Sequence, residues 1–283
     1  MEITDWPSVK NCAAGRLRSD SRVLATDAPS TAAPFPVRRV LGVEFFVGTI
    51  EAATERAVSG GGLVVAPSGP GLAVDLVKSP AYREALTTAD LAITDSGWMV
   101  LLWRALTGEK LPRHSGLKLI RAVLAREDLK APGAIFWVMP SAEECARNLA
   151  WLQAQGFAVT EADTYLAPHY APGPIHDEEL LRRIEQRRPR VVMLAIGGGV
   201  QERLGCGLRA QLSYRPGILC LGAAIAFLTG GQASIPPWAD RLFLGWLLRL
   251  ASSPRKFWRR YWDALALAPL LRRYRERLPD LRT

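Results

Sequence analysis

Three short polar or glycine-rich segments of this 283-residue sequence each follow an apolar run and precede a helical pattern. They are residues 67–71 (Pro-Ser-Gly-Pro-Gly), 95–97 (Asp-Ser-Gly) and 197–202 (Gly-Gly-Gly-Val-Gln-Glu). Turns of this kind bring backbone N–H groups to the positive end of a helix dipole, where a phosphate can bind. Each turn is a weak signal by itself, and residues 197–202 match neither the dinucleotide fingerprint nor the Walker pattern.

The polar residues near these turns also have purely structural interpretations. Asp95 stands where a helix N-cap is expected, an arrangement that stabilises a helix by about 1 kcal/mol. Gln201 and Glu202 fit an ordinary first helical turn, in which the glutamate complements the helix dipole. Arg113 and His169 lie in loop segments, where most such side chains are solvated. The residue types alone therefore leave both capping and catalysis open for Asp95.

Five short apolar runs rich in β-branched residues have the length of strands that are buried on both faces. They are residues 63–66, 91–94, 135–139, 191–196 and 218–221. Helical patterns lie between them, at residues 71–88, 97–106, 117–126, 142–155, 177–187 and 201–212. This succession predicts an α/β fold with a doubly wound, mostly parallel, Rossmann-like sheet. In such a sheet the ligand site lies at the carboxyl ends of the strands, where the three polar turns are expected.

Length and composition exclude several classes of protein. The chain is 49% hydrophobic and 22% charged, which excludes a disulfide mini-protein, a fibrous protein and a disordered chain. The longest apolar stretch, residues 218–228, is shorter than the roughly 18 residues that a transmembrane helix needs. The first 38 residues lack the apolar region of a secretory signal. The four cysteines form no Cys-x-x-Cys pair, and we expect reduced thiols in the cytoplasm.

Charge is distributed unevenly along the chain. The formal net charge is +9, and residues 241–283 carry eleven basic and three acidic side chains, so this segment holds +8 of it. Aromatic residues at helical spacing accompany these cations, among them Trp258, Tyr261 and Trp262. Such a mixture favours a peripheral contact with an anionic membrane surface, because tryptophan and tyrosine prefer the headgroup region. A helix packed on the core with a solvated basic face is the alternative.

These patterns divide the chain into three parts. Residues 1–38 contain the run ATDAPSTAAPFP without apolar periodicity and are predicted to be a mobile arm. Residues 39–240 are predicted to form the α/β core. Residues 241–283 are predicted to form a basic helical appendage.

Taken in order along the chain, these pieces resemble the WecG/TagA/CpsF glycosyltransferase family over about residues 40–262. Asp95 and its turn look like the family's Asp-Gly turn, and Arg113 to Gly116 look like its Arg-x-x-Gly segment. Residues 197–202 look like its Gly-x-Pro-Lys-Gln-Glu loop. The basic tail is similar to the family's RAPxW and EWLxRLxxEPxRxxxRY segments. The matching tail residues are Pro236, Trp238, Trp246, Leu247, Arg249, Leu250, Pro254, Arg260 and Tyr261.

The sequence departs from the family pattern mainly near the expected site. The family's Thr-x-Asn after the first strand is Ala-Pro-Ser here, and the arginine of its RAP segment is a serine. Family residues are replaced at Ala66, Ser68, Lys118, Gly199, Val200, Ser234, Gly245, Ser253 and Lys256. The identity of the donor sugar therefore cannot be inferred from the family. Asp95 and the Gln-Glu pair match the family pattern, so the reaction type can be inferred from it.

The resemblance implies an inverting transfer of a sugar from a nucleotide-sugar donor, expected to be a UDP-sugar, to a polyprenyl-diphosphate-linked acceptor in bacterial cell-surface polysaccharide synthesis. Asp95 is then the catalytic base that takes the acceptor's proton. The sequence contains no Asp-x-Asp triplet, so we expect no metal ion and no cofactor, with helix N-termini and arginines stabilising the departing diphosphate. The residues expected to bind substrate are Ser68, Arg113, Gly197, Gly198, Gly199, Gln201, Glu202, Arg249, Lys256 and Arg260.

The same resemblance places the enzyme in the cytoplasm, peripheral on the inner face of the cell membrane, with residues 241–283 attaching it and closing the active site. Two alternatives stay open. One is a nucleotide-binding regulatory protein of this fold without turnover, motivated by the departures at Ser68 and Ser234. The other is a nucleic-acid-binding protein that uses the basic tail through phosphate contacts. The aromatic residues of the tail argue against a nucleic-acid partner, and homo-oligomerisation is left open.

Overall fold

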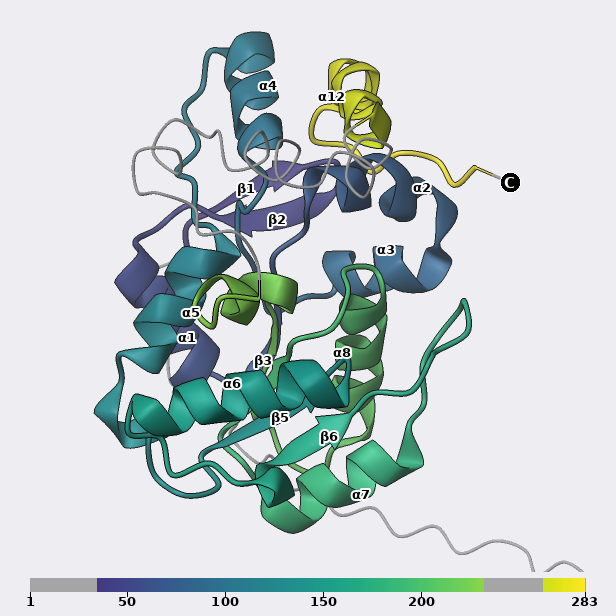
Figure 1. Cartoon of the computed structure of the whole chain (residues 1–283). Helices are drawn as coiled ribbons and strands as arrows, with labels where there is room; N and C mark the ends of the chain where they lie inside the picture. The colour runs from purple at the N-terminus through teal and green to yellow at the C-terminus, as the bar shows by residue number, and fades with distance from the viewer. Residues whose placement is uncertain (1–34, 232–261, 283) are drawn as a thin grey trace, which may run out of the picture. The chain divides into compact units, whose positions relative to one another are not determined.

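The computed structural model describes residues 35–231 and 262–282. In this part of the chain eight strands form one sheet, in the order β1-β2-β4-β3-β8-β7-β5-β6. Figure 1 labels β1, β2, β3, β5 and β6 of this sheet among the helices that surround it. Neighbouring strands are parallel except for β1 and β2, which form an antiparallel hairpin at one edge. The predicted doubly wound, mostly parallel α/β fold is confirmed.

The strands and helices alternate along the chain after the first hairpin. The strands are β1 (Val37–Val40), β2 (Val43–Phe46), β3 (Gly62–Val65), β4 (Leu91–Ala92), β5 (Ile135–Met139), β6 (Thr164–Leu166), β7 (Val191–Leu194) and β8 (Gly217–Cys220). The α-helices are α1 (Ile50–Ser59), α2 (Leu76–Lys78), α3 (Pro80–Thr87), α4 (Gly97–Thr107), α5 (Gly116–Leu124), α6 (Ala142–Ala154), α7 (Glu178–Arg187), α8 (Val200–Gln211) and α12 (Leu267–Tyr274). Shorter helical turns are η1 (Gly71–Asp75), η2 (Glu127–Leu129), η3 (Glu161–Asp163) and η4 (Gly222–Phe227).

Strand side chains alternate between two hydrophobic clusters, one on each face of the sheet. In β3, Leu63 and Val65 belong to one cluster and Val64 belongs to the other. Successive strand residues point to opposite faces, so both faces of these strands are buried. The cluster of Leu63 includes side chains from η1, α2, α3, α4, α7, α8 and α12, whereas the cluster of Val64 includes side chains from α1, α5, α6 and η4.

Serine N-caps begin several of the helices that follow strands. Ser96 Oγ accepts from the Met99 N–H at the start of α4, and Ser115 Oγ accepts from the Lys118 N–H at the start of α5, both at 3.2 Å. Each cap satisfies a backbone donor that the first helical turn leaves without a partner. The caps therefore set where the chain turns back from the carboxyl edge of the sheet.

The helix predicted over residues 71–88 is divided into η1, α2 and α3. Pro80 occupies the first turn of α3, and Ser79 before it is extended and caps that helix through a 3.2 Å bond from the Tyr82 N–H. A proline disfavours the helical conformation of the residue before it, which explains the break. The other five predicted helices and all five predicted strands are confirmed, with small shifts at their ends.

Part of the segment expected to be an appendage packs on the α/β body. Leu267, Leu270 and Leu271 of α12 are buried in the same cluster as the core residues of α4 and α8. The indole N–H of Trp98, at the start of α4, donates to the Ala264 carbonyl oxygen at 3.1 Å. Removing α12 would therefore expose apolar surface on the body.

Candidate active site

The chain after β3, β4 and β8 comes together around Gly116, the first residue of α5. A methyl group built at Gly116 would lie 3.8 Å from Ala66 Cβ, 3.8 Å from Asp95 Oδ1 and 3.8 Å from the Leu221 carbonyl oxygen. These neighbours follow β3, β4 and β8, respectively. Three strand exits thus share one small space at the carboxyl edge of the sheet, the position of ligand sites in doubly wound folds.

Asp95 is half-buried, and one backbone group holds its carboxylate. The Gly116 N–H donates to Asp95 Oδ1 at 2.8 Å, and Arg113 Nε donates to the Asp95 carbonyl oxygen at 3.3 Å. Within residues 35–231 and 262–282, no hydrogen bond reaches Oδ2. The carboxylate is therefore fixed at one oxygen by the start of α5.

Asp95 does not cap the helix that follows it. Ser96 has the extended backbone of an N-cap, and its hydroxyl accepts from the Met99 N–H at the start of α4. The capping interpretation of Asp95 is therefore wrong. Its side chain instead joins the β4 exit to the start of α5, which is a long-range contact.

Ser68, in the turn after β3, organises the start of η1. The Gly71 N–H donates to Ser68 Oγ at 3.3 Å. A methyl group built at Gly69 would lie 3.1 Å from Ser96 Oγ and 3.7 Å from Ala264 Cβ. The first of these distances is tighter than an ordinary contact, so this turn packs closely against the start of α4 and against the C-terminal segment.

The turn after β7 is shaped by Gly199, whose φ of +88° lies in the region that favours glycine. The Gly199 N–H donates to Glu202 Oε2 at 2.6 Å, and the Gly199 carbonyl oxygen accepts from Arg203 Nε at 2.9 Å. Gly197 and Gly198 are exposed, and a methyl group at Gly197 would meet nothing within 4 Å. Gly199 therefore maintains the turn, while the two glycines before it leave space beside the N-terminus of α8.

Glu202 is buried with only 1% of its surface exposed, although it lies in the first turn of α8. Its Oε2 accepts from the Gly199 N–H, and its Oε1 accepts from Gln201 Nε2 at 3.1 Å. Burial raises the pKa of Glu202 to about 7 against the effect of these bonds, and the negative charge of Asp75 raises it further. Asp75 belongs to η1, and its Oδ2 lies 3.4 Å from a methyl group built at Gly199.

Gln201 is 4% exposed and carries a buried acceptor that no group of residues 35–231 and 262–282 satisfies. Its Nε2 donates to Glu202 Oε1 and, at 3.3 Å, to the Cys220 carbonyl oxygen. In the described part of the chain its Oε1 has no hydrogen-bond partner, and it lies 3.5 Å from a methyl group built at Gly222, just after β8. An unsatisfied buried acceptor is costly, so Oε1 is suited to an N–H or O–H group of a ligand.

The predicted site residues fall into two groups along the carboxyl edge. Ser68 and Asp95 lie at the exits of β3 and β4, Arg113 lies between α4 and α5 beside Asp95, and residues 197–202 follow β7. Because β3 and β8 lie between β4 and β7, the end of β4 is about 14 Å, or three inter-strand spacings, from the end of β7, and the end of β3 is about two spacings away. Asp75 reaches from the first group toward the second through its position beside Gly199.

Some residues of the site were predicted and others were not. Arg249, Lys256 and Arg260, with Ser234, lie outside the described residues. Asp75 and Arg203 are not predicted, because each lies inside a helical pattern that shows no chemical motif.

Among the described residues, no group of three or more His, Cys, Asp or Glu side chains is arranged to hold a metal ion. In the same residues, no helix is both long enough and apolar enough to cross a membrane.

Comparison with known proteins identifies the family of the chain. The profile of the Glycosyl transferase WecG/TagA/CpsF family matches residues 38–280, from β1 to beyond α12. The chain is also similar to an N-acetylglucosaminyldiphosphoundecaprenol N-acetyl-beta-D-mannosaminyltransferase of Bacillus spizizenii, with 22% identity over 206 residues, or 70% of this chain and 74% of that relative. The resemblance inferred from the ordered motifs is confirmed. The chain therefore belongs to the WecG/TagA/CpsF family and is a glycosyltransferase.

Proposed function

We propose that this glycosyltransferase is an inverting, metal-independent enzyme that moves a sugar from a UDP-sugar to a polyprenyl-diphosphate-linked sugar during synthesis of a bacterial cell-surface polysaccharide. The name of the Bacillus spizizenii relative states an N-acetylmannosaminyl transfer and an undecaprenyl-diphosphate-linked N-acetylglucosamine. The class of the transferred sugar and of the acceptor is taken from that relative, and the UDP carrier from the family resemblance. The observation that carries it is the Asp95 carboxylate, held at Oδ1 by the Gly116 N–H where three strand exits meet.

Asp95 acts as the general base in the proposed reaction. The acceptor hydroxyl attacks the anomeric carbon of the donor, Asp95 Oδ2 takes the hydroxyl proton, and the nucleoside diphosphate leaves with the electrons of the bond that breaks. A single displacement of this kind inverts the anomeric configuration. Because the Gly116 N–H fixes Oδ1, the carboxylate is already oriented and needs little reorganisation during the reaction.

The departing diphosphate needs positive charge, and the turn after β7 offers it. Gly197 and Gly198 are exposed beside the N-terminus of α8, where backbone N–H groups and the helix dipole favour an anion. Arg113 lies beside Asp95 and is proposed to supply a second positive charge to the same diphosphate from the side of the reacting sugar. Arg249, Lys256 and Arg260 are proposed to complete this cationic set, because guanidinium groups bind phosphates through paired donors.

Turnover with defined donors tests the proposal. The full-length chain is incubated with UDP-N-acetylmannosamine, UDP-N-acetylglucosamine or UDP-glucose, together with a short-chain lipid-diphosphate N-acetylglucosamine, and release of UDP is measured. We expect acceptor-dependent release with one of these donors and a product of inverted configuration by NMR. A chain that binds UDP but releases no UDP from any of these donors would instead favour a nucleotide-binding regulatory protein without turnover.

Peripheral attachment to an anionic membrane completes the proposal. Trp262 and Leu265 are 66% and 51% exposed just before α12, and Leu101 of the adjacent α4 is also exposed. Exposed aromatic and aliphatic side chains in a strongly basic segment suit the headgroup region of a bilayer. Deleting the segment would remove the buried leucines of α12, so substitutions test this surface more cleanly.

The double variant Trp262→Ala and Leu265→Ala is expected to bind phosphatidylglycerol vesicles about tenfold more weakly than wild type in sedimentation assays. Leu166→Ala is a matched control, because Leu166 is a similarly exposed leucine on β6, the strand at the opposite edge from β1. Binding should also fall as salt rises, since surface charges are screened beyond about 8 Å at physiological ionic strength. Unchanged vesicle binding by the double variant would remove these side chains from the proposed contact.

A further inference from the structure

The order of the strands indicates in which orientation the proposed donor lies along the carboxyl edge of the sheet. Asp95 follows β4 and is proposed to lie beside the reacting sugar, whereas residues 197 and 198 follow β7 and are proposed to contact the diphosphate. The nucleoside is attached to the far end of the diphosphate. It must therefore continue past β7, toward the ends of β5 and β6. The segment that leaves the end of β6 is the loop of residues 167–177, called the β6–α7 loop below.

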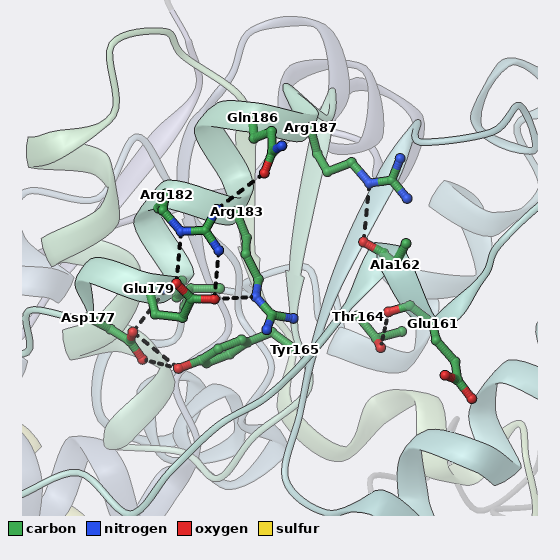
Figure 2. Close-up of polar contacts among 11 residues, drawn as sticks. Glu161, Ala162, Thr164, Tyr165, Asp177, Glu179, Arg182, Arg183, Gln186 and Arg187 are labelled. Atoms are coloured by element: carbon green, nitrogen blue, oxygen red, sulfur yellow. Dashed lines mark hydrogen bonds and ion pairs between the residues drawn. The ribbon is translucent and has the colours of Figure 1, made fainter.

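Both ends of the β6–α7 loop are held by one carboxylate. Tyr165 donates its hydroxyl to Asp177 at 2.9 Å, and Tyr170 donates its hydroxyl to the same carboxylate at 2.6 Å (Figure 2 shows the Tyr165 contact). Asp177 also caps α7 by accepting from the Leu180 N–H at 3.0 Å. The Arg183 guanidinium lies 5.5 Å from the centre of the Tyr165 ring. Burial and the Asp177 carboxylate raise the pKa of Tyr165 to about 12, so its hydroxyl remains a donor.

Arg203 of α8 holds the middle of the β6–α7 loop. Its Nη1 donates to the carbonyl oxygens of Ala171, at 2.8 Å, and Gly173. Its Nε donates to the carbonyl oxygen of Gly199 in the turn after β7. Arg203 is only 9% exposed, and in the described part of the chain it has no ion pair with a carboxylate. Its buried charge is therefore stabilised by carbonyl groups from two separate loops.

The surface of α8 is shaped to receive this loop. A methyl group built at Gly207 would collide with the Ile175 carbonyl oxygen, so the close approach requires a glycine. The Ile175 side chain is buried in the same cluster as Leu204 and Leu208 of α8. The loop is thus packed as well as hydrogen-bonded, although most of its residues are exposed on their other side.

Resting on the proposed donor site, we infer that the β6–α7 loop forms a wall of the pocket for the donor's nucleoside, and that Arg203 is the positioning residue that holds this wall against the turn after β7. Arg203 reaches the backbone of both segments with one planar side chain. A lysine has a single terminal nitrogen and cannot make the same three contacts in this geometry. The inference concerns where the nucleoside binds and leaves the chemistry at Asp95 unchanged.

Hydrogen exchange of the full-length wild-type chain tests the location directly. The ligands are inorganic pyrophosphate and a panel of UDP, GDP, CDP and ADP. We expect pyrophosphate to slow amide exchange only around residues 197–203, and the best-binding nucleoside diphosphate to slow exchange in residues 167–177 as well. Because this measurement uses no variant, it does not depend on how a substitution affects folding.

Substitution of Arg203 tests its positioning role. In Arg203→Gln we expect the affinity for the nucleoside diphosphate to fall about tenfold and the affinity for pyrophosphate to change less than about threefold. The KM for the donor should rise while kcat at saturating donor and the KM for the acceptor stay within about threefold. Arg203→Lys should recover only part of the loss. Arg209→Gln is a matched control, because Arg209 lies on the same helix and contacts Thr88 and Asp90 instead.

The outcomes separate this inference from the proposed function. Absence of nucleotide-dependent protection in residues 167–177 overturns the inference, as does an equal loss of nucleotide and pyrophosphate affinity in Arg203→Gln. A wild-type chain that binds pyrophosphate but no member of the panel also overturns it. A wild-type chain that binds none of these ligands overturns the proposed donor site itself, and the inference with it. If Arg203→Gln does not fold, the exchange experiment decides alone.

Discussion

Two carboxylates at the carboxyl edge of the sheet have different surroundings. Asp95 is half-buried, and a single backbone N–H holds its Oδ1, whereas Oδ2 receives no bond from the described residues. Glu202 is fully buried, and both of its oxygens accept hydrogen bonds from the protein. Environment, rather than residue type, therefore distinguishes the carboxylate that we propose as the general base from one that holds a turn.

The same contrast applies to the turns that carry these residues. Glu202 uses its bonds to fix the backbone of Gly199 and the side chain of Gln201. Asp95 makes one contact with α5, through Oδ1, and we propose that its other oxygen faces the substrate. If this comparison is right, substitution of Asp95 should affect catalysis, and substitution of Glu202 should affect stability.

The largest expected effect is on catalysis by Asp95→Asn. We expect kcat to fall by about 10² to 10⁴, the usual range for loss of a general base. The amide oxygen of asparagine can still accept from the Gly116 N–H, so the melting temperature should remain close to that of wild type. Turnover is measured as UDP release at saturating substrates.

Asp128→Asn is a suitable control for this loss, because Asp128 is an exposed carboxylate that pairs with Arg126 and Arg190. It should keep kcat near the wild-type value. A folded Asp95→Asn protein with near wild-type kcat would remove Asp95 from the mechanism and end the contrast with Glu202.

The next effect is the pH dependence of stability that Glu202 contributes. Its pKa is about 7 in the folded protein, against the ordinary glutamate value of 4.5. The folded protein therefore keeps a proton at Glu202 that the unfolded chain loses, so this contribution to the free energy of unfolding is full below pH 4.5 and is lost as the pH rises through 7. The loss amounts to about 3 kcal/mol, because one pKa unit corresponds to about 1.4 kcal/mol.

Urea unfolding at pH 5 and pH 8 measures this contribution. Glu202→Gln should remove most of the difference between the two pH values that Glu202 causes in wild type. Asp95→Asn should leave the difference unchanged and serves as the matched variant. An identical pH dependence in wild type and Glu202→Gln would show that Glu202 is ionised in the folded protein throughout this range.

Substitutions at two neighbouring glycines of the turn after β7 should affect different properties, one UDP binding and the other stability. Both effects should be smaller than those described above. Gly198 is exposed, so Gly198→Val should leave stability nearly unchanged and weaken UDP binding about tenfold by blocking backbone approach. Gly199 has a φ of +88° and lies against Asp75, so Gly199→Ala should cost about 1–2 kcal/mol of stability. Calorimetry with UDP and urea unfolding give the two quantities. Equal UDP affinity in wild type and Gly198→Val would mean that this turn does not contact the diphosphate.

Much of the fold follows from local patterns in the sequence, and the exceptions have physical causes. The central strands are continuous apolar runs because both of their faces are buried. Strand β6 is only three residues long and pairs on one side, so it has no such run. Helix α1 buries the small residues Ala53 and Ala57, which give a weak periodic signal. The turn between β1 and β2 places Leu41 at a φ of +50°, where a turn signal would require glycine or asparagine.

The site is less predictable than the fold because its contacts join distant parts of the chain. The position of Asp95 is predictable, since it follows an apolar run, but its bond to Gly116 crosses 21 residues. Arg203 looks like any helical arginine in the sequence, and its partners Ala171 and Gly173 are about thirty residues away. Asp75 lies within a predicted helix, and only the packing of η1 brings it to Gly199. Local pattern therefore locates the turns, and packing decides which side chains meet.

The smallest expected effect is that of removing divalent cations. The sequence contains no Asp-x-Asp triplet, and the turn after β7 offers backbone N–H groups and a helix N-terminus to the diphosphate. We therefore expect enzyme treated with EDTA and dialysed to keep its rate of UDP release within about twofold, and added Mg²⁺ or Mn²⁺ to change it no further. A strict requirement for either cation would contradict this prediction. The carboxylates at the carboxyl edge of the sheet would then have to be examined as metal ligands. Asp75 would then be the first to test, because it lies beside both Gly199 and Glu202, and Asp75→Asn should lower the affinity for the cation if the diphosphate is held through a metal there.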